Sequence, residues 1–345
     1  MSQMANYRGS GRIGPVVSVV IPVRDGAATI AAAVDSALGQ EFDRPFEVIL
    51  VNDGSTDETR EALEGYRDRI KLVDLPGRGI AAARNVGIFA AEGEYVALLD
   101  ADDTWLPHKL ARMILAMERE PDCVLAFSDA IRVDGDGNEL AASHVPARHR
   151  HAPSLAEMLT ECWHILPSAT IIRRSTLTRI GGFSERFGSG YGAEDVHCWI
   201  MARECGPFLF APEPLARYRV STSTDRLRKR ARMISNRREP LEYVANELHF
   251  YRALRERHGA AARRMLRDVR RGAAQTLMGL GLTAMNLGQT AFARRCYLAS
   301  LKLWPPQPKT VVRMTATVLP AMMARSLSSM LPRRYARALF GPAQA

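Results

Sequence analysis

The stretch Tyr95-Val96-Ala97-Leu98-Leu99-Asp100-Ala101-Asp102-Asp103 decides how this chain folds. Its five leading apolar residues are typical of a strand buried on both faces of a parallel sheet. Three carboxylates follow, and carboxylates held this close together repel one another unless a cation or a basic side chain compensates them. Mg²⁺ and Mn²⁺ prefer oxygen ligands, usually one or two carboxylates together with substrate phosphates. The stretch therefore predicts either a divalent-cation site at the end of a buried strand or a solvated acidic turn.

Strands and helices alternate regularly on either side of this stretch. Apolar, β-branched runs predict strands, and the segments between them have helical propensity. Upstream we expect strands at 16–23, 46–51 and 70–75 and helices over 27–38, 55–66 and 80–91. Downstream we expect helices over 105–119 and 193–204, strands at 123–128, 167–173 and 208–210, and a hairpin around 131–140. Such alternation predicts a doubly wound α/β sheet.

The net charge of +10 comes entirely from the C-terminal third of the chain. Residues 1–220 hold 23 Lys and Arg against 31 Asp and Glu, whereas residues 221–345 hold 24 against 6. Strongly basic helical segments are typical of proteins that bind anionic membrane surfaces or nucleic acid. Few aromatic residues and no recognisable reading motif accompany these charges, which disfavours nucleic acid. We therefore expect the basic region to contact an anionic membrane surface.

Helical periodicity continues through most of the basic region. An antiparallel pair over 273–287 and 290–303 resembles one tetratricopeptide-like hairpin, and an apolar-faced helix is expected over 311–331. We divide the chain into a flexible N-terminus (1–15), an α/β domain (16–225) and a basic helical region (226–345).

Cysteine usage and hydropathy bear on the compartment. The five cysteines are scattered without a C-x-x-C pair, which disfavours a disulfide framework or zinc site and fits a reducing compartment. We find no secretory leader and no apolar run of about 18 residues that predicts a membrane span. These features predict a cytoplasmic protein that lies peripherally on the inner face of the membrane.

Five motifs between residues 16 and 220 occur in an order that resembles the inverting, GT-A-fold glycosyltransferases of family 2. Asp53 ends the second expected strand, Asp100 and Asp102 end the later one, and Asp195 begins a helix after a glycine-rich loop. The matching segments are 17–23, 51–57, 79–87, 99–103, and Gly182-Phe183 followed by Gly192-Ala193-Glu194-Asp195. The resemblance implies a GT-A α/β domain with a doubly wound mixed sheet, followed by an all-α region.

The resemblance also implies a nucleotide-sugar site. Asp53 matches the family's aspartate that binds the nucleotide base, beside the backbone edge of the first strand, and Asp100 lies near the ribose or sugar. Arg84 adds positive charge near the donor, although a surface or helix-capping arginine is an equal interpretation. The expected nucleotide-sugar-binding residues are Pro22, Val23, Asp53, Arg84 and Asp100.

Metal binding and proton transfer fall to the remaining acidic residues. By resemblance, Asp102 holds the divalent metal, Mn²⁺ or Mg²⁺, and Asp195 is the base that accepts the proton of the acceptor hydroxyl. Inversion requires one in-line displacement, so a carboxylate on the acceptor side of the anomeric carbon suits the chemistry. Glu194 supports Asp195, and Asp103 supports either the metal or the sugar site.

One departure and two alternatives accompany this interpretation. Many relatives carry a histidine soon after the Tyr-Arg that ends the domain, whereas Tyr218-Arg219 is followed by hydroxyl residues. Arg219 and those hydroxyls are then candidates for phosphate contacts. Gly77-Arg78-Gly79 superficially fits a dinucleotide fingerprint, which would indicate a nicotinamide oxidoreductase. A non-catalytic nucleotide-sugar-binding module is the other alternative.

The function expected from all these features is a metal-dependent, inverting glycosyl transfer. The donor is a nucleotide-sugar, with a UDP-sugar favoured, and the acceptor is a hydroxyl of a saccharide or a lipid-linked saccharide. Surface polysaccharide synthesis is the expected setting.

Overall fold

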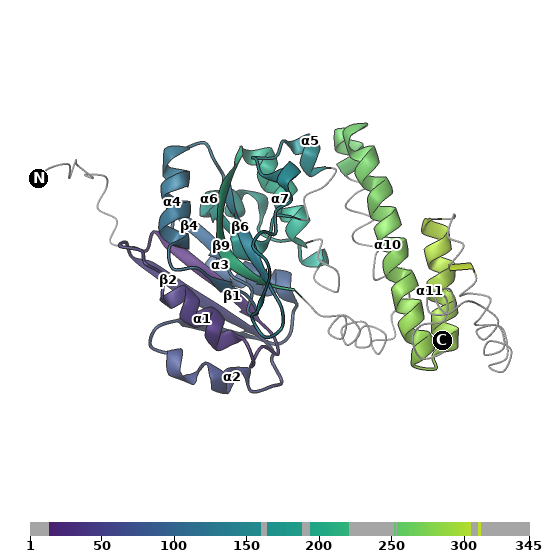
Figure 1. The fold of residues 1–345 in the computed structure, drawn as a ribbon, viewed down its shortest axis with the longest axis horizontal. Coiled ribbons are helices and arrows are strands. Elements are labelled where there is room, and N and C mark those ends of the chain that lie inside the picture. Colours follow the sequence, from purple (N-terminus) through teal and green to yellow (C-terminus); the bar gives the residue numbers. More distant parts are fainter. Residues whose placement is uncertain are drawn as a thin grey trace, which may run out of the picture.

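The computed structural model describes residues 14–159, 164–187, 194–220, 252, 254–304 and 310–311 (Figure 1). Its centre is a nine-stranded mixed sheet in which eight strands follow the order β3-β2-β1-β4-β8-β6-β9-β5, and β7 pairs with β6. The strands are β1 (Val17–Val23), β2 (Phe46–Asp53), β3 (Lys71–Leu75), β4 (Tyr95–Leu98), β5 (Thr104–Trp105), β6 (Leu125–Val133), β7 (Glu139–Ala141), β8 (Thr170–Arg173) and β9 (Phe208–Arg219). The helices are α1 (Ile30–Leu38), α2 (Thr59–Ala62), α3 (Ile80–Ala90), α4 (Lys109–Arg119), α5 (Leu155–Met158), α6 (Arg174–Ile180), α7 (Glu194–Cys205), α10 (Ala261–Asn286) and α11 (Thr290–Leu303).

The N-terminal half of the sheet is parallel, as the sequence predicts. β1 pairs in parallel with both β2 and β4, and β2 pairs in parallel with β3. All seven residues of β1 are buried, because helices cover both faces of the sheet. One apolar layer joins the sheet to α3, α6 and α7, and the opposite layer joins it to α1 and α4.

The second half of the sheet contains antiparallel strands, so the sheet is mixed as the resemblance implies, but several element bounds differ from those expected. β8 runs antiparallel to both β4 and β6, whereas β9 runs parallel to β6 and pairs along its whole length. The strand expected at 208–210 therefore continues to Arg219. The helix expected from 105 begins only at Lys109, because Pro107 disfavours helical backbone at the residue before it, and Thr104–Trp105 instead pairs with β9. The helix α6 was not predicted.

The C-terminal hairpin matches its prediction, except that α10 starts earlier than residue 273. Leu277 and Leu280 of α10 pack against Phe292 and Tyr297 of α11 in a separate apolar cluster. Ser300 Oγ donates a hydrogen bond of 2.7 Å to the carbonyl oxygen of Ala274, which fixes the two helices side by side. Most of the helix expected over 311–331, like residues 1–13, lies outside the described residues.

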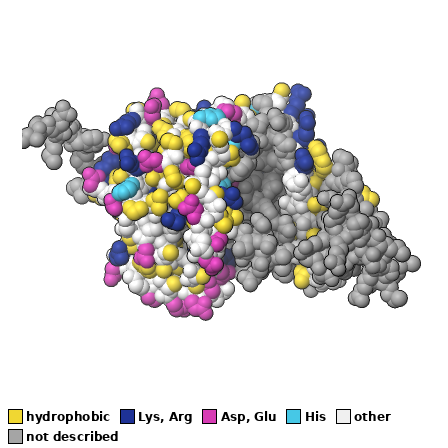
Figure 2. Space-filling model, viewed as in Figure 1, with side chains coloured by type: hydrophobic (Ala, Val, Ile, Leu, Met, Phe, Trp, Pro, Cys, Tyr) yellow, Lys and Arg dark blue, Asp and Glu magenta, His cyan; other side chains and the backbone are white. Residues whose placement is uncertain are grey.

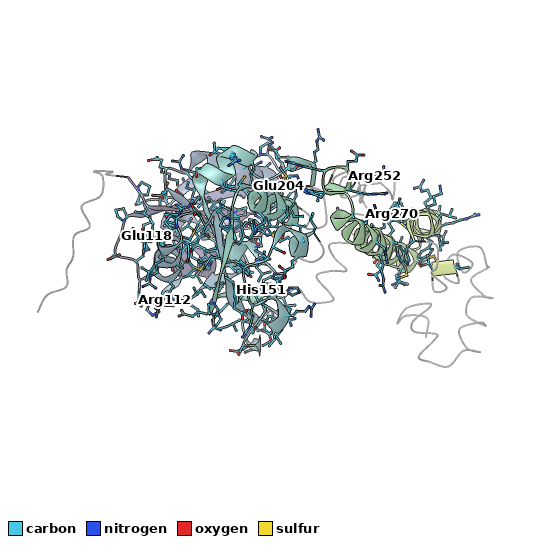
Figure 3. All side chains as sticks on the ribbon, turned by 90° about the horizontal axis from the view of Figure 1, so that it is seen from above. Arg112, Glu118, His151, Glu204, Arg252 and Arg270 are labelled. Atoms are coloured by element: carbon cyan, nitrogen blue, oxygen red, sulfur yellow. The ribbon has the colours of Figure 1, made fainter. Side chains whose placement is uncertain are left out.

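The first residues of α10 and the segment before it join this hairpin to the α/β domain. Leu254 and Ala262 are buried in the same apolar layer as α7. Glu204 at the end of α7 lies 2.8 Å from His258 Nε2 and 3.1 Å from Arg257 (Figure 3 labels Glu204). In the part of the chain that the structure describes, no helix has the length and apolar character needed to cross a bilayer.

Candidate active site

The predicted site residues lie along one edge of the sheet. β1, β2 and β4 are adjacent and parallel, so their carboxyl ends meet at that edge, where ligands of open α/β sheets bind. Pro22 and Val23 end β1, Asp53 ends β2, and Asp100 follows β4. The structure thus brings together residues that are far apart in the sequence.

Asp53 is buried and holds the loop between β3 and α3. Its two carboxylate oxygens accept hydrogen bonds of 2.7 Å from the backbone N–H groups of Arg78 and Gly79. The loops approach so closely that a Cβ on Gly54 would lie 2.8 Å from the backbone nitrogen of Gly77. A carboxylate offers about four acceptor positions, so Asp53 retains capacity for a donor group on a bound base.

The same contact weakens the dinucleotide alternative. In a dinucleotide fingerprint the backbone N–H groups of the glycine-rich turn face a pyrophosphate. Here the N–H groups of Arg78 and Gly79 already donate to Asp53. The Gly77-Arg78-Gly79 turn therefore binds the end of β2 through these two hydrogen bonds.

Asp103 anchors the loop of residues 100–103, which we call the acidic loop. Its side chain is buried and accepts hydrogen bonds from Ser168 Oγ at 2.5 Å and from the backbone N–H of Arg219 at 2.8 Å. Ser168 Oγ also accepts the backbone N–H of Asp100, at 3.0 Å. Burial and the negative charges of Asp102 and Asp100 raise the pKa of Asp103 well above its usual value. Asp103 thus supports the loop, with both oxygens engaged.

Asp102 is the exposed member of the acidic loop. The Nε of Arg219 donates to the backbone oxygen of Asp102 at 3.0 Å, and its Nη1 donates to the backbone oxygens of Asp134 and Gly135. The guanidinium of Arg219 therefore links the acidic loop to the turn between β6 and β7. Its Nε and Nη1 groups donate to backbone oxygens and not to a phosphate. Within the described ranges, no group of three or more Asp, Glu, His or Cys could hold a metal ion.

Arg84 connects the acidic loop to α7. It is 2% exposed, and its Nη2 lies 2.7 Å from Asp100 Oδ1 while its Nη1 lies 3.1 Å from Glu194 Oε1. Its guanidinium carbon also lies 5.1 Å from the centre of the Phe183 ring. Burial lowers the pKa of Arg84, but the two carboxylates more than reverse this and raise it. The surface or capping interpretation of Arg84 is therefore wrong.

Asp195 lies next to Glu194 in the first turn of α7. Its Oδ1 accepts the backbone N–H of Val196 at 2.7 Å. Burial and the negative charge of Glu194 raise the pKa of Asp195 to about 7, although the positive charge of Arg84 opposes them. A carboxylate with a pKa near neutrality is suited to accept a proton in the reaction. The glycine-rich segment at 188–192 lies outside the described residues.

Sequence reasoning missed three residues that shape this edge. Ser168 joins Asp100 to Asp103, as described above. Asn85 exchanges two hydrogen bonds with the backbone of Phe183, of 2.8 and 2.7 Å, and fixes α3 to the turn before α7. Asp129 accepts bonds from the backbone of 144–145 and from Arg150, and so holds the loop that follows β7. Only Asn85 lay inside a motif, and nothing in its spacing indicated this partner.

A histidine that the sequence did not indicate packs against Tyr218, near the end of β9. The His144 ring packs edge-on against Tyr218, with 5.2 Å between the ring centres. Burial and the charges of Asp103, Asp102 and Asp100 raise the pKa of Tyr218, which places its hydroxyl in the field of the acidic loop. This sequence lacks the histidine that many relatives carry after Tyr-Arg, whereas His144, from the loop that follows β7, packs against Tyr218.

The chain belongs to glycosyltransferase family 2. The family model described as glycosyl transferase family 2 matches residues 18–181. The amylovoran biosynthesis glycosyltransferase AmsB of Erwinia amylovora is 30% identical over 216 residues, which are 59% of this chain and 70% of that protein. The uncharacterized glycosyltransferase RP339 of Rickettsia prowazekii is 40% identical over 60% of this chain and 64% of its own length.

Two further comparisons concern a larger relative and the fold. The O-antigen biosynthesis protein RfbC of Myxococcus xanthus is 30% identical over 52% of this chain, but the match spans only 14% of RfbC. The crystal structure of S. aureus TarS 1-349 in complex with UDP-GlcNAc has a TM-score of 0.56 at 19% identity, covering 94% of this chain and 88% of that one. This likeness shows the GT-A α/β fold with a helical C-terminal region.

Proposed function

We propose that this protein is an inverting glycosyltransferase that moves a sugar from a nucleoside-diphosphate donor to an acceptor hydroxyl. The observation that carries the proposal is the Arg84 bridge, which joins Asp100 in the acidic loop to Glu194, the residue before Asp195. One buried cation thereby sets the distance between a donor-binding edge and a base. Neither the dinucleotide alternative nor a non-catalytic module accounts for a base held in this way.

The residues suggest a single displacement. Asp195 accepts the proton of the acceptor hydroxyl, and the hydroxyl oxygen forms a bond to the anomeric carbon. The bond between that carbon and the donor's diphosphate oxygen breaks, and the nucleoside diphosphate leaves with the electron pair. Attack opposite the leaving group inverts the anomeric centre. Glu194 faces Arg84, so the two adjacent carboxylates have separate tasks.

A divalent cation fits the acidic loop. Asp102 is exposed there, Asp100 and Asp102 raise the pKa of buried Asp103, and this crowding of negative charge is what a cation would relieve. Asp102 would hold Mn²⁺ or Mg²⁺ together with phosphate oxygens of the donor, in keeping with the small number of protein ligands such ions use. When bound, the ion would stabilise the charge that develops on the leaving diphosphate.

The comparisons support a UDP-sugar as donor and a polysaccharide pathway as setting. TarS, which has a similar fold, was crystallised with UDP and with UDP-GlcNAc. Relatives are named for O-antigen, amylovoran and teichuronic acid biosynthesis. We extend these to a saccharide or lipid-linked saccharide acceptor in surface polysaccharide synthesis. None of the described cysteines forms a disulfide bond, which agrees with synthesis in the cytoplasm.

A donor panel tests the proposal. Binding and hydrolysis of UDP-, GDP- and dTDP-sugars are measured with Mn²⁺, Mg²⁺ or EDTA, for the native protein, Asp102→Asn and Asp195→Asn. The exposed surface variant Asp43→Asn serves as the control. We expect metal-dependent binding of one donor class, weakened in Asp102→Asn and retained without turnover in Asp195→Asn. Binding of NAD(H) with no donor binding would favour the oxidoreductase, and donor binding without turnover in any condition would favour the non-catalytic module.

A further inference from the structure

Four arginines form one face of the N-terminal half of α10. Arg263, Arg267, Arg270 and Arg271 follow the spacing i, i+4, i+7 and i+8, which places them on one side of a helix, and all four are exposed. We call these four residues the arginine face. Dark blue side chains gather along the upper part of α10 in Figure 2, and Arg270 is labelled in Figure 3.

Nothing in the described part of the chain neutralises the arginine face. None of its four guanidinium groups has an ion-pair partner there, whereas Arg257, just before α10, pairs with Glu204. Residues 252–304 contain 11 Lys and Arg against 2 Asp and Glu, so the hairpin as a whole is basic. Like charges at i and i+4 destabilise a helix slightly. The arginine face is therefore a positively charged surface that is available to bind an external anion.

The chemistry of the face selects the partner. Guanidinium groups bind phosphate oxygens in a bidentate manner, and four in a row on a helix match a plane of phosphate groups. Single-stranded nucleic acids are usually bound by aromatic platforms next to basic residues. In this hairpin Phe292 and Tyr297 are instead buried in the core. The charge pattern thus favours the headgroups of a bilayer.

We propose that the arginine face docks the protein on an anionic phospholipid bilayer. The proposal goes beyond glycosyl transfer and does not depend on it. Each basic residue near an anionic surface contributes a similar electrostatic increment, and salt screens it within about 8 Å at physiological ionic strength. Docking is therefore reversible and sensitive to salt.

Docking would also orient the candidate base. Glu204, which contacts Arg257 and His258, lies at the opposite end of α7 from Asp195. Glu204 is nine positions after Asp195 along the helix, a rise of about 14 Å. A bilayer held by α10 would thus sit at a defined position relative to the acceptor side of the site, as an acceptor anchored in lipid requires.

Vesicle sedimentation with the full chain tests this proposal. The lipids are phosphatidylcholine alone or phosphatidylcholine with 30% phosphatidylglycerol, at about 0.05 and 0.3 M NaCl to vary the screening. The test variant replaces all four arginines of the face by glutamine. The matched control replaces four exposed arginines of the α/β domain, Arg67, Arg69, Arg112 and Arg119, and changes the net charge equally.

We expect binding to anionic vesicles that weakens with salt, a loss of at least about tenfold in the face variant, and a change within about twofold in the control. A third variant with four lysines at these positions keeps the charge and should retain most of the binding, which separates docking from misfolding. Equal binding to neutral vesicles, or equal losses in face and control variants, would overturn the proposal. So would displacement from vesicles by a short duplex DNA at 0.15 M NaCl, which would assign the face to nucleic acid.

Discussion

The active-site edge and the C-terminal hairpin differ in how their charged side chains are placed. In the active-site edge, Arg84 and Glu194 are buried, and the guanidinium of Arg84 lies 3.1 Å from Glu194 and 2.7 Å from the partly buried Asp100. In the C-terminal hairpin, the core is apolar and the arginine face remains in solvent without partners among the described residues. Buried charges lose much stabilisation when one partner is removed, whereas exposed ones contribute little to the fold. Substitutions at the edge should therefore affect catalysis and stability, and those on the hairpin surface should affect contacts with other molecules.

The largest effect is expected from removing the base. Asp195→Asn should lower kcat by about 10²–10⁴-fold, the usual contribution of a positioned base, while the dissociation constant of the donor stays within about threefold. Donor binding by calorimetry and single-turnover product formation measure the two quantities. Loss of donor binding equal to the loss of turnover would show that Asp195 belongs to the donor site instead.

The Asp195→Asn variant should be at least as stable as the native protein at alkaline pH. The native state holds a proton on Asp195 up to a pH of about 7, whereas the ordinary value for this carboxyl is 3.8. The folded pKa is raised, so the stability gained from the bound proton is lost as the pH rises through about 7. Asparagine carries no such charge, and the melting temperature of Asp195→Asn at pH 8 should equal or exceed that of the native protein. A clear fall would contradict the partly buried environment of Asp195 beside Glu194.

Replacing the buried bridge tests the comparison most directly. Arg84→Met leaves two carboxylates facing each other, and removal of one partner of a buried ion pair destabilises a protein by about 3–5 kcal/mol. Such a loss corresponds to a fall in melting temperature of about 6–20 °C. The control is Arg78→Met, because the Arg78–Glu185 pair is half exposed and should contribute at most about 1 kcal/mol. Equal shifts in melting temperature for the two variants would show that the buried ion pairs of Arg84 stabilise the fold no more than the half-exposed Arg78–Glu185 pair does.

The pH profile should follow the same charges. Because the pKa of Asp195 is about 7, kcat/KM should rise about tenfold per pH unit below that pH and level off above it, where the base is deprotonated. Arg84 lowers the pKa of Asp195, so Arg84→Met should move the rising limb to higher pH. A purely structural role of Arg84 would reduce the rate without moving the limb. A flat native profile between pH 5.5 and 8 would exclude Asp195 as the base.

The sequence predicted where the acidic residues of the site lie better than it predicted the contacts that hold them. Asp53, Asp100 and Asp102 lie within three residues of the ends of apolar runs, and since parallel strands end at one edge, their shared location follows from periodicity. The contacts that bind this edge together have no local signal. Asp103 meets Ser168 across 65 positions, and Arg84 meets Glu194 across 110.

Longer-range packing also explains the errors in the fold. The two-residue strand Thr104–Trp105 exists only because β9 runs beside it, and β9 is long only because β6 offers partners as far as Arg219. Local propensity contains neither fact. The hairpin of α10 and α11, in contrast, forms between neighbours in sequence, and its helices were predicted from their apolar spacing.

The smallest effects should come from two glycines of α10, which compare space inside and outside the hairpin core. A Cβ on Gly281 would lie 2.5 Å from Cε1 of Tyr297, so Gly281→Ala should force the helices apart and destabilise the hairpin by about 1–3 kcal/mol. A Cβ on Gly272 would have no heavy atom within 4 Å, and alanine is the better helix former there by up to about 1 kcal/mol. Thermal unfolding should therefore shift in opposite directions for the two variants, while donor binding stays unchanged in both, because the core of the hairpin is separate from the active-site edge. Two shifts of the same sign would contradict the packing of α11 against Gly281, and a change in donor binding would show that the hairpin contributes to the site.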